Sequence, residues 1–191
     1  MILPPFIIYS YTQVEKETPS AAIHYVKTIA KICIFVYVLN EVKPDAVIHC
    51  AAWTAVNLAE DKDKKSKVYA INVQGTANIA AACKALDYKM MYISTDYVFN
   101  GKGDIPWQPD CKNYAPLNYY GETKLGGELT VSEQLEKYFI VRIAWVFGLN
   151  GKNFIKTMLD IGKAHDIIRI VNDQIGTPHL YAGSGTAFAV D

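Results

Sequence analysis

Glycine is missing from the first 74 residues of this 191-residue chain, and the first one is Gly75. A dinucleotide-binding fold opens with a strand, a glycine-rich turn and a helix, because only glycine lets the backbone approach a pyrophosphate at the helix N-terminus. The N-terminal segment therefore lacks that phosphate-binding turn. The run Gly183-Ser184-Gly185 follows no predicted strand and opens no predicted helix, so we do not interpret it as a replacement.

The chain also has few cysteines, a formal net charge of zero and few long apolar runs. The four cysteines show no Cys-x-x-Cys spacing, so we expect reduced thiols and no metal site. Lys plus Arg total 19, as do Asp plus Glu, which gives no electrostatic reason to expect a nucleic-acid or acidic-membrane partner. The apolar start, MILPPFIIYSYT, carries two prolines, lacks a basic segment and is too short to span a bilayer. We therefore expect a cytoplasmic protein.

Apolar strands and amphipathic helices alternate regularly from about residue 45 onward. We predict strands over residues 32–38, 45–51, 88–94, 138–144 and 167–171, helices over 21–31, 64–86, 118–135 and 153–163, and a loop over 100–116. This alternation predicts an α/β fold, a doubly wound, Rossmann-like parallel sheet with helices on both faces. Ligands of such sheets bind beyond the carboxyl ends of the strands, which places residues 50–54, 94–97 and 143–147 on one rim.

Tyr120 and Lys124 lie one helical turn apart in a predicted helix, so their side chains share a face. A phenol with a pKa of about 10 transfers protons poorly at neutral pH, and a neighbouring ammonium is expected to lower that pKa. Thr95, at the end of a predicted strand, adds a hydroxyl that can orient a carbonyl oxygen. With 13 tyrosines and 17 lysines among 191 residues, about one Tyr-x-x-x-Lys arises by chance. The spacing alone therefore fits a solvated lysine beside a packing tyrosine equally well.

Longer stretches around these residues resemble the dTDP-4-dehydrorhamnose reductase family, a branch of the extended short-chain dehydrogenases/reductases. The two longest are Tyr92–Gly101 (YISTDYVFNG) and Pro116–Glu128 (PLNYYGETKLGGE). Shorter stretches agree in order and register over residues 47–60, 70–77, 141–148, 153–158 and 173–178. The resemblance covers residues 41–178 and implies a Rossmann-like NAD(P)-dependent oxidoreductase.

The resemblance also implies a reaction and its residues. Hydride passes from NADPH or NADH to the 4-keto group of a dTDP-sugar in dTDP-L-rhamnose biosynthesis, with a nucleotide-sugar as partner. The implied catalytic residues are Thr95, Tyr120 and Lys124, the cofactor-binding residues are Ala51, Ala52, Trp53, Tyr120 and Lys124, and the substrate-binding residues are Thr95, Asp96 and Trp145. Tyr120 would donate the proton, and Lys124 would hold the cofactor ribose.

Three assignments have plainer structural alternatives. Trp145 fits a core position at a strand end, and Asp96 fits a residue that caps a loop. Asn72 matches an asparagine that in many of these enzymes supports the catalytic lysine through a water. Its alternative is an asparagine that only caps or pairs within its own helix.

The chain departs from the family at both ends. Residues 1–40 match neither the family's opening strand and glycine-rich turn nor the residues that choose between NADH and NADPH. After Pro178 the family pattern stops, where a small substrate-binding domain would continue. We therefore predict a Rossmann-like NAD(P)-binding and catalytic domain over residues 1–178, and a remnant of the substrate domain or a tail over 179–191. A homodimer stays open, and the alternative function is a non-catalytic or truncated member, similar to the regulatory β subunit of methionine adenosyltransferase.

Overall fold

The computed structural model describes residues 7–8, 21–149 and 153–181, and the side chains of residues 32–149 and 153–178. It divides into two compact units, residues 1–142 and 143–191, which we describe separately. The tail predicted over residues 179–191 lies largely outside the described residues, and so does the Gly183–Gly185 run.

The first unit is a parallel sheet with helices between its strands. Its elements are β1 (Ile7–Ile8), α1 (Ala21–Val42), β2 (Ala46–His49), α2 (Val56–Ala59), α3 (Lys62–Tyr69), the π-helix η1 (Ala70–Gly75), α4 (Thr76–Ala85), β3 (Lys89–Thr95), the 3-10 helix η2 (Asp96–Val98), α5 (Tyr119–Gln134) and the start of β4 (Tyr138–Gly148). Ile7 lies opposite Val47, and Val47 opposite Met90, in parallel register. The predicted Rossmann-like α/β fold is confirmed.

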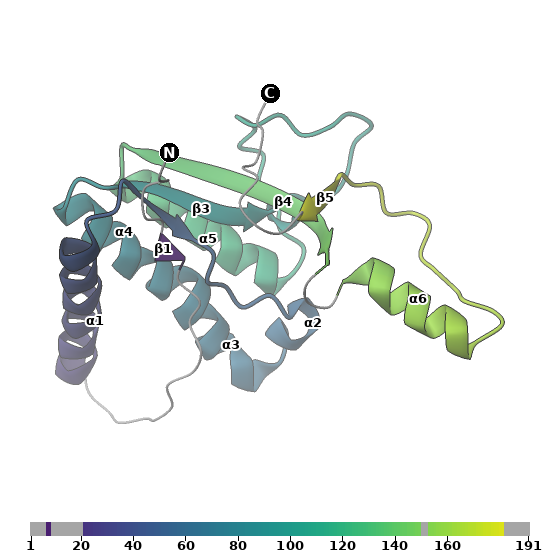
Figure 1. Cartoon of the computed structure of the whole chain (residues 1–191), viewed down its shortest axis with the longest axis horizontal. Helices are drawn as coiled ribbons and strands as arrows, with labels where there is room; N and C mark the ends of the chain where they lie inside the picture. The colour runs from purple at the N-terminus through teal and green to yellow at the C-terminus, as the bar shows by residue number, and fades with distance from the viewer. Residues whose placement is uncertain (1–6, 9–20, 150–152, 182–191) are drawn as a thin grey trace. The chain divides into compact units, whose positions relative to one another are not determined.

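Helices α1, α4 and α5 of this unit form one layer. The strand order β1-β2-β3-β4 steps in a single direction, and right-handed crossovers in one direction place their helices on one face. Figure 1 shows α1, α4 and α5 along the same side of the strands. Val47 and Met90 point into this layer and are buried, whereas Ile48 and Met91 are half-buried. We expected helices on both faces of the sheet. Because α1, α4 and α5 all cover the same face, none of these three helices covers the opposite one.

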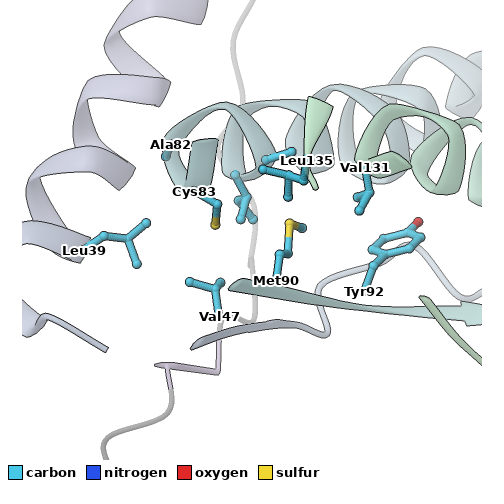
Figure 2. Packing of buried hydrophobic residues seen from close by; sticks show 10 residues of the cluster. Leu39, Val47, Ala82, Cys83, Met90, Tyr92, Val131 and Leu135 are labelled. Carbon is cyan, nitrogen blue, oxygen red and sulfur yellow. The ribbon is translucent and has the colours of Figure 1, made fainter. Parts of the chain in front are cut away.

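The core lies between this layer and the sheet. Leu39 of α1, Cys83 of α4 and Val131 of α5 face Val47 and Met90 (Figure 2). Burying each such side chain stabilises the fold by about 1.5–3 kcal/mol. Because α5 runs back along β3, packing of its C-terminal half near the start of β3 brings its first turns to the end of that strand.

The predicted strand over residues 32–38 is wrong, because these residues belong to α1. Phe35, Val36 and Leu39 pack into the core, and Ile34 and Tyr37 are exposed. That spacing is the helical period, which a continuous apolar run hides. Tertiary packing of α1 against α4 therefore outweighs the strand preference of the β-branched and aromatic side chains.

The second unit contains the rest of β4, α6 (Phe154–Ala164) and β5 (Pro178–Tyr181). β5 pairs with β4 in parallel, with Ala144 opposite Pro178. The strand predicted over residues 167–171 is wrong, since these residues form no strand and Ile167 is 81% exposed. A strand needs a neighbour for its backbone hydrogen bonds, and β5 takes that place beside β4. No helix in the described part of the chain is long and apolar enough to cross a membrane.

Candidate functional site

The start of α5 places the Tyr120 side chain inside the first unit. Asn118 caps the helix by accepting a hydrogen bond from the Gly121 backbone N–H at 2.8 Å. A Cβ at Gly121 would collide with the Tyr97 carbonyl oxygen, so glycine lets the helix start lie against η2. Tyr120 is 9% exposed, and its ring meets the Tyr97 ring edge-on with centroids 5.6 Å apart. A Tyr120 on the solvated side of α5 is thereby excluded.

Thr95 and Asp96 adjoin Tyr120 at the end of β3. The Thr95 side chain lies near the Tyr120 phenol and acts to lower the pKa of that group. The Thr95 hydroxyl donates to Asp96 Oδ1 at 3.1 Å and accepts from the Tyr97 backbone N–H at 3.3 Å. Thr95 is therefore the residue that caps η2, and the Asp96 carboxylate is held by Thr95.

Lys124 also reaches the end of β3. Its ammonium donates to the Ile93 carbonyl oxygen at 2.7 Å and lies 4.0 Å from the centroid of the Tyr92 ring. Burial lowers the pKa of Lys124 to about 7, and Glu128 and Cys50 act in the opposite direction. Only Ser94 separates Ile93 from Thr95, so Lys124 and Tyr120 approach the same strand end.

The electrostatics of Tyr120 differ from the expectation. We expected the ammonium of Lys124 to lower the pKa of the phenol, but burial raises the pKa of Tyr120, and nearby Asp96 and Tyr97 raise it further. Only the nearby Thr95 side chain acts in the opposite direction. The physical reason is that burial disfavours the phenolate, while the Lys124 ammonium is directed at Ile93 and Tyr92. Tyr120 is therefore protonated at neutral pH.

Asn72 links the stretch after β2 to α5. Its side-chain oxygen accepts from the Trp53 backbone N–H at 2.7 Å, and its amide nitrogen donates to the Trp53 carbonyl at 3.4 Å and to Thr123 Oγ1 at 3.0 Å. Thr123 in turn donates to the Tyr120 carbonyl oxygen at 3.0 Å. The alternative that Asn72 only pairs within its own helix is therefore wrong.

The predicted cofactor-binding residues lie beside this link. Ala51, Ala52 and Trp53 follow β2 and are half-buried. The Trp53 side chain packs on the small apolar cluster that contains Val68 and Tyr120. The structure thus brings this stretch, the end of β3 and the start of α5 together.

Trp145 lies in the second unit. It has a positive φ of 47° at an irregularity in the β4–β5 register, a conformation that is uncommon for a residue other than glycine. Its ring is 47% exposed, and a Cβ at Gly176 would lie 3.2 Å from it. The alternative of a plain core residue is therefore wrong, and the proximity of Trp145 to the substrate stays a prediction.

From the sequence we did not identify the buried polar residues that lie near Lys124. Glu128 is 1% exposed and paired with Arg142, and buried His49 bonds Thr76 Oγ1 through Nε2 at 3.0 Å. Burial lowers the pKa of His49 to about 3, so this ring is neutral. Two signals were available, an arginine inside an apolar strand and a glutamate one turn after Lys124. Among the described residues, no group of three or more His, Cys, Asp and Glu side chains could hold a metal ion.

We predict that Gly127→Ala destabilises the protein and Gly126→Ala does not. A Cβ at Gly127 would collide with the Tyr92 hydroxyl and lie 2.8 Å from the Asn72 carbonyl oxygen, whereas at Gly126 it meets only the movable Val73 side chain at 3.0 Å. We expect Gly127→Ala to lower the free energy of unfolding by about 1–3 kcal/mol. Gly126→Ala should be neutral, or stabilising by up to about 1 kcal/mol, through its helix preference. Urea unfolding of both variants measures this, and equal stability of the two would contradict the packing.

Comparison with known proteins places this site in a family context. The RmlD substrate binding domain matches residues 21–183. The dTDP-4-dehydrorhamnose reductases of Escherichia coli and Burkholderia thailandensis are both 40% identical, over 140 and 159 residues, which is 73% and 80% of this chain. The crystal structure of dTDP-4-dehydrorhamnose reductase from Bacillus anthracis in complex with NADP is 43% identical over 78% of this chain, with a TM-score of 0.72.

Each match covers a larger share of this chain than of the relative. The chain spans 46% of the E. coli relative, 51% of the Burkholderia relative and 52% of the Bacillus structure, about half of each. The family match, by contrast, includes most of this chain and all of the residues discussed above. The chain belongs to the family of the RmlD substrate binding domain.

Proposed function

We propose that this chain carries the catalytic half of a reductase of the dTDP-4-dehydrorhamnose reductase type, which reduces the 4-keto group of a dTDP-sugar. The observation that supports this most is that the buried side chains of Thr95, Tyr120 and Lys124 all lie at the end of β3. The names of the relatives support the substrate class, and a solved relative in complex with NADP supports the cofactor.

The residues present fit one half of a nicotinamide cofactor. The stretch Ala51–Trp53, fixed by Asn72, together with Tyr120 and Lys124, would hold the nicotinamide and its ribose. The pyrophosphate half fits poorly, because no glycine precedes Gly75 and a tight turn that presents its backbone N–H groups to the phosphates needs glycine. When bound, NADPH or NADH would supply the hydride.

The residues of the chain would supply the proton and hold the carbonyl group. Reduction adds a hydride to the carbonyl carbon and a proton to its oxygen. Tyr120 is protonated at neutral pH because its pKa is raised, so its hydroxyl can donate that proton. Thr95 would orient the same oxygen, and Lys124 would hold the cofactor ribose. Asp96 and Trp145 would contact the nucleotide-sugar.

Three further assignments accompany this proposal. Residues 1–178 would form the NAD(P)-binding and catalytic domain, and residues 179–191 a remnant of the substrate domain or a tail. We propose a cytoplasmic location, in line with the biosynthetic relatives. A homodimer stays open as the assembly.

The missing glycine favours a second function. A non-catalytic member, similar to the regulatory β subunit of methionine adenosyltransferase, would keep the fold without needing a tight phosphate contact. A non-catalytic function, however, gives no reason for Thr95, Tyr120 and Lys124 to lie at the same strand end.

A reductase assay decides between the two functions. The purified chain is mixed with millimolar NADPH and a dTDP-4-keto sugar, and loss of NADPH absorbance is followed alongside sugar products by mass spectrometry. The reductase predicts turnover that Thr95→Val lowers by about 10-fold, since the substrate keeps its other contacts. If circular dichroism shows that the chain is folded and the assay yields no reduced sugar, the result favours the non-catalytic function.

A further inference from the structure

Arg142 and Glu128 form a buried ion pair that the proposed reaction does not use. Arg142 Nε donates to Glu128 Oε1 at 2.9 Å, and its Nη2 donates to Oε2 at 2.7 Å. The Glu128 side chain is 1% exposed and that of Arg142 17%. Two parallel bonds of this kind fix the orientation of both groups as well as their distance. The pair therefore ties β4 rigidly to α5.

The same guanidinium contacts the segment 99–115. Its Nη2 donates to Tyr114 Oη at 3.2 Å, and its Nη1 donates to the Pro109 carbonyl oxygen at 3.4 Å. Its Cζ lies 5.1 Å from the centroid of Phe99, which stacks on Trp107 with centroids 4.6 Å apart. One cation thus contacts three residues of the segment, and Trp107 joins them through its stacking on Phe99.

The segment 99–115 has a direct connection to the site. It begins four residues after Thr95 and ends five residues before Tyr120. Its two ends are joined by a hydrogen bond from the Ala115 N–H to the Val98 carbonyl oxygen at 3.0 Å. Any displacement of the segment must therefore pass to the end of β3 or to the start of α5.

Glu128 faces Lys124 on the other side. The two residues are one turn apart on α5 and both are buried. The titratable groups around the ammonium of Lys124 are Glu128 of α5, His49 and Cys50 at the end of β2, and Tyr92 of β3. Glu128 is the only carboxylate in this set, and Arg142 balances its charge.

We propose that Arg142 and Glu128 are positioning residues, which hold the segment 99–115 against α5 and set the balance of charge beside Lys124. Neither residue is assigned a contact with substrate or cofactor. The kinetic importance of the pair rests on the proposed reductase function, whereas its two structural consequences can be measured without turnover.

The first consequence is protection of the segment from trypsin, which can cut after the exposed Lys102 and Lys112. Arg142→Met removes all the polar contacts of the guanidinium, so cleavage at these two sites should accelerate by about 10-fold or more relative to the exposed Lys163. Lys137→Met breaks an exposed pair with Asp87 of 2.6 Å and should leave the ratio within about 2-fold of wild type.

An unchanged ratio in Arg142→Met would overturn the positioning of the segment. If that variant unfolds and trypsin cuts all sites at similar rates, the cleavage ratio is measured in Arg142→Lys instead. Lys keeps the charge near Glu128 but loses the second parallel bond, so cleavage at Lys102 and Lys112 should still rise, by about 3-fold, at unchanged Lys163 cleavage. A wild-type ratio there would equally overturn it.

The second consequence concerns the charge of Lys124, read from the pH dependence of its ε-carbon chemical shift by NMR of the chain with 13C-labelled lysine, in which Lys124→Met identifies the signal. Arg142→Met leaves the Glu128 charge uncompensated and should move the titration of Lys124 to higher pH. Glu128→Gln removes that charge and should move it to lower pH. Shifts of equal sign, or none, would overturn the charge balance. If these results hold while wild type shows no turnover, the reductase proposal fails and the positioning role stands.

Discussion

Replacing Tyr120 with Phe is expected to lower kcat by about 10²- to 10⁴-fold, the usual effect of losing a general acid, with little change in KM. Phe keeps the edge-on contact with the Tyr97 ring and removes only the hydroxyl near Thr95. The change therefore separates proton donation from packing. Rates of dTDP-4-keto sugar reduction at millimolar NADPH measure it.

The matched control is Tyr97→Phe, which removes a hydroxyl from the other ring of the pair and keeps the Tyr120 hydroxyl. Its kcat should stay within about 3-fold of wild type. Lys124→Met should harm both kcat and KM, because it removes a charge beside Tyr120 and the proposed ribose contact. A Tyr120→Phe variant with near-normal kcat would mean that the proton comes from water or from another group.

The second large effect is expected in cofactor affinity. NADPH should bind this chain about 10²- to 10⁴-fold more weakly than it binds relatives with a glycine-rich turn, since two lost charge-assisted hydrogen bonds are each worth about 1.5–3 kcal/mol. The first glycine of this chain is Gly75, too late in the chain to form a turn after β1. Nicotinamide fluorescence during titration measures the dissociation constant, with the Bacillus anthracis reductase as reference.

Salt dependence provides the control for this affinity. If Lys124 holds the ribose without any phosphate contact, affinity should depend weakly on ionic strength and fall with Lys124→Met. A dissociation constant in the low micromolar range would show that another segment binds the phosphates in place of the glycine-rich turn.

Much of the site follows from local sequence alone. The apolar runs that became β2 and β3, the helix from Tyr119 to Gln134 and the placement of Thr95 at a strand end all depend on short-range periodicity and caps. Tyr120 and Lys124 share a helix face because helical geometry requires it at that spacing. Resemblance to a known family then turned a spacing that chance could produce into a specific hypothesis.

Tertiary structure decided what local pattern leaves open. An apolar run such as residues 32–38 fits a strand or a buried helix, and only packing of Leu39 and its neighbours against α4 selected the helix. Residues 167–171 form no strand, because a strand depends on a partner that is distant in sequence. The raised pKa of Tyr120, the Asn72 link and the Arg142–Glu128 pair likewise depend on burial and on contacts between distant residues. The sequence by itself determined which residues could react, and the packing of α5 on β3 decided which of them meet and in which protonation state.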